Sequence, residues 1–137
     1  MKARLAVLGC GLAIFLTGLV QGGDSKSDKK ALQGTWTVTE GDKKGVFHFE
    51  GDKFTVTFED DQPYKGTFKL DGSKKPKAID MMIKKGEKYV GMTAQAIYKI
   101  EKNKLTWCAS EPGNDRPTEF VQSDGTLLLV LERKKKE

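Results

Sequence analysis

The sequence has little of the chemistry that most enzymes and metal proteins need. Its 137 residues include only one histidine and two cysteines, too few for the common zinc sites built from these side chains. It contains no G-x-S-x-G, H-E-x-x-H or C-x-x-C motif and no Walker loop. The carboxylates have no spacing that singles out a general acid and base pair. We therefore expect no enzymatic activity, no cofactor and no metal.

The sequence has no large cluster of charges of one sign. Lys and Arg number 24 against 19 Asp and Glu, a net charge of +5, but the two signs are interspersed. A nucleic-acid surface needs a basic stripe, so we expect no nucleic-acid partner. The exceptions are short lysine runs, among them residues 74–75 and 134–136.

The only long apolar run lies near the N-terminus. Lys2 and Arg4 precede the uncharged residues 5–20, which is the order found in a secretory signal peptide, and cleavage is expected before Gly23. The run is shorter than the roughly 20 residues of a membrane span. We expect a secreted or periplasmic protein that is not an integral membrane protein after cleavage. An uncleaved anchor, or lipidation at Cys10 in a loose lipobox, are the competing interpretations.

The sequence divides into four segments, and removal of the first would leave one cysteine. We expect a signal peptide at residues 1–22, a polar lead at 23–31, one domain at 32–133 and a basic tail at 134–137. Cys108 then has no partner for an intrachain disulfide. It lies in an apolar run without a nearby histidine, which predicts a buried, inert thiol in a monomeric protein.

Alternating apolar and polar residues predict eight strands. The pair Gly51-Asp52 between two such runs is a strong hairpin signal. The last run is apolar on both faces and should be the best-covered strand. The predicted strands are residues 32–39, 46–50, 54–59, 64–70, 79–84, 89–100, 105–109 and 126–132.

Short connections between sequential strands favour an all-β, eight-stranded, up-and-down antiparallel barrel, with a two-sheet sandwich as the alternative. One short helical turn, capped by Ser27, is expected before the first strand. Only residues 110–124 form a long connection.

The side chains expected to face inward are almost wholly apolar: Phe47, Phe49, Phe54, Val56, Phe58, Phe68, Ile79, Met81, Ile83, Met92, Ile100 and Leu105. A barrel of eight strands is either filled by such side chains or keeps one small ligand. A ligand would therefore be hydrophobic. The residues expected to line its pocket are Phe49, Phe54, Val56, Phe68 and Met81.

The start of the first strand carries a resemblance. Gly34-Thr35-Trp36, after a short helical turn, resembles the G-x-W signature of lipocalins. The resemblance implies that Trp36 closes the barrel base and that Arg133, near the end of the last strand, packs over its ring. An Arg above an indole face is a sound cation–π contact.

A closer resemblance covers nearly the whole mature chain. The segments at residues 32–36, 64–71, 75–80 (KPKAID) and 111–120 (EPGNDRPTEF) resemble the hallmarks of a lipocalin-like family abundant in planctomycetes, which has no established activity. In the last segment, Arg116 and Glu119 are expected to pair with each other or to clamp the loop.

Three hypotheses for function follow. The first is an exported barrel that binds a small hydrophobic ligand. The second is a solid-core module in which residues 110–124 or a rim of lysines engage an envelope protein. The third treats the lysines at 74–75 and 134–136 as a patch for phospholipid or polysaccharide, although such runs are usually solvated tails.

Overall fold

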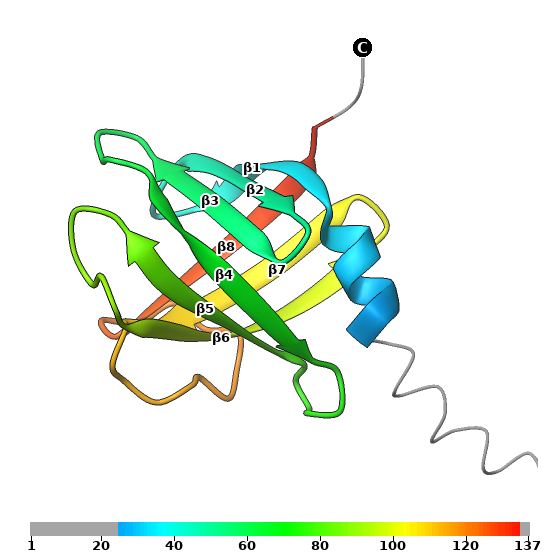
Figure 1. The fold of residues 1–137 in the computed structure, drawn as a ribbon. Helices are drawn as coiled ribbons and strands as arrows, with labels where there is room; N and C mark the ends of the chain where they lie inside the picture. Colours follow the sequence, from blue (N-terminus) through cyan, green and yellow to red (C-terminus); the bar gives the residue numbers. More distant parts are fainter. Residues whose placement is uncertain (1–24, 135–137) are drawn as a thin grey trace, which may run out of the picture.

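A computed structural model describes residues 25–134, which contain one closed barrel of antiparallel strands (Figure 1). Each strand pairs with its neighbours in sequence, and β1 also pairs with β8, which closes the sheet. The predicted up-and-down barrel is confirmed, and the sandwich alternative is wrong. The strands are β1 (Gly34–Gly41), β2 (Gly45–Glu50), β3 (Lys53–Phe58), β4 (Tyr64–Asp71), β5 (Ala78–Lys85), β6 (Thr93–Glu101), β7 (Lys104–Ser110) and β8 (Thr126–Arg133).

The β2–β3 hairpin has the predicted two-residue turn. Glu50 pairs directly with Lys53, so Gly51 and Asp52 alone reverse the chain. Gly51 has a φ of 63°, a conformation that glycine adopts without the steric cost of a side chain. The turn sets the register in which Phe47 and Phe49 face the same side as Val56 and Phe54.

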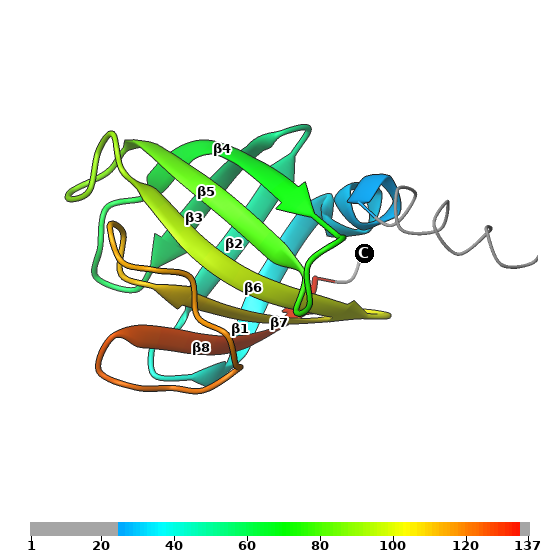
Figure 2. The same ribbon diagram turned by 90° about the horizontal axis from the view of Figure 1, so that it is seen from below.

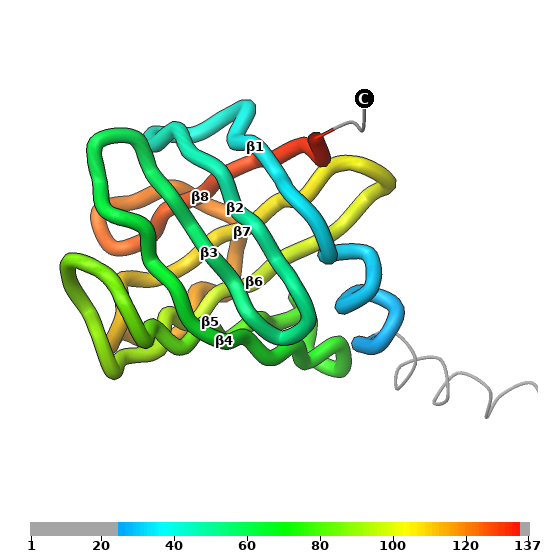
Figure 3. The backbone as a smooth tube through the Cα atoms, turned by 45° about the horizontal axis from the view of Figure 1, so that its top comes forward, coloured from blue at the N-terminus to red at the C-terminus, as the bar shows by residue number. Residues whose placement is uncertain are grey.

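The meander places its connections alternately at the two ends of the barrel (Figures 2 and 3). At one end, here called the base, the helix of residues 25–32 lies beside the β2–β3, β4–β5 and β6–β7 turns. The other end, the mouth, carries the β1–β2, β3–β4 and β5–β6 connections and the long β7–β8 loop of residues 111–125. Any opening into the barrel at the mouth is therefore bordered by these four connections.

Aromatic side chains pack the barrel interior towards the base. Trp36, Phe47 and Phe49 are fully buried. The Phe49 ring meets Phe68 edge to face, with centroids 5.1 Å apart, and Phe47 at 6.3 Å. Such edge-to-face packing stabilises a core beyond the area that it buries.

The helix is fastened across the base. Leu32 is buried, and Asp28 Oδ2 accepts hydrogen bonds from Lys77 Nζ at 3.0 Å and from Tyr98 Oη at 2.8 Å. Ser25 Oγ accepts a bond from the Gly72 amide. Ser27 lies inside the helix, so its predicted role as the N-cap is wrong.

The predicted strand at residues 89–100 begins too early. β6 starts at Thr93, because Tyr89 and Gly91 have φ values of 66° and 89° and form a turn that returns to β5 through a bond from the Gly91 amide to the Ile83 carbonyl. Val90 and Met92 are consequently 57% and 40% exposed. Placing Met92 among the inward residues was therefore wrong.

The best-covered strand is β7 rather than β8. In β8 only Leu129 and Leu131 are fully buried, whereas Leu128 and Val130 on the other face are half-buried. In β7 the outward Cys108 and Ser110 are buried as well as the inward side chains. The reason is the long β7–β8 loop, whose backbone lies over the outer face of β7.

Candidate functional site

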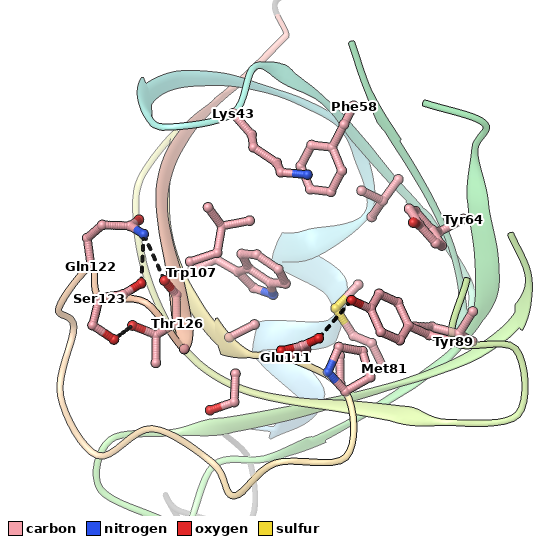
Figure 4. Close-up of a pocket in the computed structure, with 18 of the residues that line it drawn as sticks. Lys43, Phe58, Tyr64, Met81, Tyr89, Trp107, Glu111, Gln122, Ser123 and Thr126 are labelled. Carbon is pink, nitrogen blue, oxygen red and sulfur yellow. Dashed lines mark hydrogen bonds between the residues drawn. The ribbon is translucent and has the colours of Figure 1, made fainter. Parts of the chain in front are cut away.

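A cavity of about 330 Å³ opens at the mouth of the barrel (Figure 4). Its volume lies within the range of roughly 300 to 1,000 Å³ that is usual for small-molecule pockets. Strands from most of the barrel contribute to its wall, so the pocket is part of the folded interior rather than a surface dent. The wall is apolar and comprises Phe54, Val56, Phe58, Met81, Ile83, Ala94, Trp107, Ala109 and Leu127.

The rim of the cavity is polar and comes mainly from the β7–β8 loop. Tyr89 Oη, from the β5–β6 connection, donates a hydrogen bond to Glu111 Oε2 at 3.0 Å and so joins two of the mouth connections. Gln122 Nε2 donates to the Thr126 carbonyl at 2.8 Å, and the Leu128 amide donates to Gln122 Oε1 at 2.9 Å. These bonds hold the loop beside the opening.

A lysine lies on the opposite side of the mouth. Lys43 Nζ is 5.0 Å from the centroid of the Phe58 ring and 3.8 Å from Asp61 Oδ2. The ring attracts the ammonium through a cation–π interaction, and both groups of the exposed ion pair remain solvated. Lys43 therefore borders the cavity, with its charge already matched by Asp61.

Both tyrosines of the mouth remain protonated at neutral pH. The hydrogen bond to Glu111, followed by burial, raises the pKa of Tyr89. Burial, followed by the charges of Asp61 and Glu87, raises the pKa of Tyr64. Each phenol therefore carries an O–H that can donate a hydrogen bond, and neither adds negative charge to the site.

The structure divides the residues that the sequence suggested as pocket lining. Phe54, Val56 and Met81 line the cavity. Phe49 and Phe68 do not, because they pack against each other towards the base. Alternation along a strand tells which side chains point inward, but the depth of each along the barrel axis depends on the strand tilt.

Sequence reasoning missed several lining residues. Trp107, Ala94 and Leu127 share the cavity wall but were not among the proposed ligand contacts. The alternation that places Leu105 inward also places Trp107 inward, since the two are separated by one residue. That signal was present in the sequence for Trp107.

The residues of the G-x-W resemblance, Gly34, Trp36 and Arg133, lie next to one another at the base. Trp36 is fully buried, and its Nε1 donates to the Leu32 carbonyl at 2.8 Å. Arg133 pairs with Trp36 across β1 and β8, and its guanidinium lies 4.3 Å from the centre of the indole ring. Arg133 also donates to the carbonyls of Gln33 and Ala31. Gly34 has a φ of 113°, which strongly favours glycine.

In the loop motif, Arg116 forms an ion pair with Asp80 rather than with Glu119. Arg116 Nη2 lies 2.7 Å from Asp80 Oδ1, and its Nη1 donates to the Ala96 carbonyl at 3.0 Å. The pairing of Arg116 with Glu119 is not formed, and the Glu119 side chain is exposed. The segments at 75–80 and 111–120 therefore meet on the outer face of β5 and β6, and Arg116 fixes the loop to the barrel.

The clamped loop buries Cys108. The thiol is fully buried, and its Sγ approaches the carbonyls of Glu119 at 3.7 Å and Val121 at 3.6 Å. Burial is the main cause that raises the pKa of Cys108. Because the thiolate is the reactive form, the native thiol should be inert until the loop opens.

Removal of the clamp should therefore speed the reaction of Cys108. In a Cys10→Ser background, Arg116→Ala loses an ion pair and a bond to a buried carbonyl, and we expect Cys108 to react about tenfold faster with a chromogenic aromatic disulfide. The absorbance of the released thiolate measures the rate. Glu119→Ala should leave the rate unchanged, and equal rates for both variants would show that Arg116 does not hold the loop.

The single histidine is half-buried at the side of the barrel. His48 Nδ1 lies 2.9 Å from Thr35 Oγ1, and its Nε2 is 3.7 Å from Glu50 Oε1. His48 is not among the residues that line the cavity. It therefore contributes no acid or base to the candidate site.

The described residues contain neither a metal-binding cluster nor a membrane-spanning helix. Between residues 25 and 134, no three His, Cys, Asp or Glu side chains gather as a metal site would require. The helix in that range is too short and polar to cross a bilayer. The expected signal peptide and cleavage site lie outside the described residues.

The sequence matches no protein-family model, and no curated protein and no solved structure matches the chain.

Proposed function

We propose that this protein is an exported, lipocalin-like barrel that holds a small hydrophobic molecule in the cavity at its mouth and catalyses no reaction. The observation that carries the proposal is the cavity of about 330 Å³ with an apolar wall and a polar rim. Apolar walls with a few polar groups are typical of small-molecule sites. A folded barrel with a solid core would leave no such space.

The base supports the lipocalin-like part of the proposal. A short helix precedes β1, Trp36 lies under Arg133, and one closed meander of strands surrounds the core. Export rests on the basic and then apolar order of residues 1–22. The clamp at Arg116 is structural in this proposal, since it fixes the loop beside the opening.

Recovery of a bound molecule tests the proposal. The purified full chain is incubated with a total lipid and metabolite extract, separated from free small molecules by gel filtration, and examined by mass spectrometry under denaturing conditions. We expect one class of small apolar molecule to be enriched. Chain kept unfolded in urea during the incubation is the control. Equal recovery from folded and unfolded chain, or repeated recovery of empty protein, would contradict the container function.

A further inference from the structure

Trp107 places a hydrogen-bond donor inside the apolar cavity. The residue lies in β7, its side chain is 6% exposed, and its ring meets Phe47 edge to face at 4.9 Å. Figure 4 shows the indole in the middle of the pocket, and its ring nitrogen is covered by the surrounding side chains. The packing against Phe47 fixes the direction of the N–H bond.

The indole N–H of Trp107 has no acceptor among residues 25–134. Nε1 is buried and makes no hydrogen bond there, whereas Nε1 of Trp36 donates to the Leu32 carbonyl. A buried donor without an acceptor destabilises a fold, so nearly all such groups are satisfied in native proteins. Trp107 therefore has an unused bond for a molecule that enters the cavity and displaces the side chains covering Nε1.

The charges around the cavity indicate what kind of acceptor fits. Glu111 and Asp124 bring two carboxylates to the rim, and the single ammonium that residues 25–134 place there, Lys43, is next to Asp61. A ligand carboxylate would have to leave water in an acidic surrounding with no free cation beside it, which is costly. An uncharged oxygen avoids this cost and still accepts from Nε1.

We propose that Trp107 is the polar anchor of the cavity, and that the ligand is a small, uncharged, largely apolar molecule whose carbonyl or ether oxygen accepts a hydrogen bond from Trp107 Nε1. This inference rests on the proposed container function and names the class of ligand. The apolar wall holds the body of the molecule, and the indole N–H sets its orientation.

Two probes of the same shape separate the anchor from the container. Acetophenone and α-methylstyrene differ only in a carbonyl oxygen against a methylene group, and both suit the cavity, since an apolar void of about 150 Å³ already accepts benzene. Titration calorimetry should give a ratio of acetophenone to α-methylstyrene affinity that is about tenfold higher for the full chain than for a variant without the indole N–H, because the ketone must exchange its bonds to water for the bond to Nε1.

The two indole groups provide a direct readout without any variant. In proton–nitrogen correlation spectra of the full chain, the side-chain signal of Trp107 should move downfield when acetophenone binds and much less when α-methylstyrene binds. The signal of Trp36 should stay in place, because its N–H is already bonded to Leu32. Trp36 is thus an internal control in the same sample.

Trp107→Phe keeps a ring against Phe47 and removes the N–H. We expect α-methylstyrene to bind this variant with little change and the affinity for acetophenone, and with it the ratio of the two affinities, to fall about tenfold. Phe58→Leu is the matched control, since it alters the apolar wall without touching Nε1. That variant should weaken both probes together and leave the ratio as it is in the parent chain.

Each contrary result has a distinct meaning. The same ratio of affinities in the parent chain and in Trp107→Phe, with an unmoved Trp107 signal, would overturn the anchor and leave the container standing. Tighter binding of benzoate than of acetophenone would overturn the uncharged acceptor. Absence of binding for all three probes would count against the container itself, and the anchor would fall with it.

Discussion

Replacing Trp36 with alanine should lower the free energy of unfolding by about 3 to 5 kcal/mol, which is the usual range for the loss of a large buried ring. Trp36 is among the fully buried side chains of the core. The substitution also removes the donor to the Leu32 carbonyl and the surface on which Arg133 stacks. Three contacts at the base are lost together.

Urea denaturation followed by circular dichroism measures the effect. Trp36→Phe is the graded control, because it keeps a ring under Arg133 and loses only the donor and part of the buried area. It should cost about 1 to 3 kcal/mol, mainly for the buried carbonyl of Leu32 left without its partner. If Trp36→Ala unfolded at the same urea concentration as the parent chain, the assignment of Trp36 to the closure of the base would be refuted.

The base could be anticipated because its determinants are local. Gly34 and Trp36 are two residues apart in one strand, and the hairpin at Gly51-Asp52 follows from the conformational freedom of glycine alone. Alternation at period 2 needs no knowledge of the rest of the chain either. These signals predict the number, order and faces of most strands.

The mouth depends on contacts between distant residues, and local patterns say little about them. The turn at Tyr89 and Gly91 takes up the start of the run at residues 89–100, which looks like continuous strand. The cover on Cys108 depends on Arg116 reaching Asp80 on another strand. Neither contact leaves a signal in the spacing of the residues involved. The sequence therefore predicted inward faces well and the depth of the cavity poorly.

The same division explains why the base and the mouth can serve different purposes. At the base, Trp36 Nε1 donates to the Leu32 carbonyl and Arg133 donates to the Gln33 carbonyl. At the mouth, the Trp107 N–H is buried without an acceptor among the described residues, and the interior is not filled. Buried polar groups are hydrogen-bonded at the base, whereas the mouth leaves one buried donor without an acceptor and some interior space unfilled. Proteins tend to depart from good packing and full hydrogen bonding at functional sites.

Filling the cavity from within should abolish binding and raise stability at the same time. Ala94 lines the cavity and pairs with Met81 on the neighbouring strand. Ala94→Phe would place a ring in the space proposed for the ligand, and we expect the affinity for α-methylstyrene to fall at least about 100-fold, or about 2.7 kcal/mol. Ala94→Val should give an intermediate loss, because it occupies less of the space.

Stability should change in the opposite direction. An added apolar side chain that finds open space gains buried area, and cavity-filling changes commonly add about 0.5 to 2 kcal/mol. Met82→Phe is the matched control, since Met82 is exposed on the adjacent strand and its ring would leave the cavity unchanged. Calorimetric titration gives the affinity and thermal unfolding gives the stability. A large fall in melting temperature for Ala94→Phe would mean that the interior is already filled, because only a packed core is strained by extra atoms.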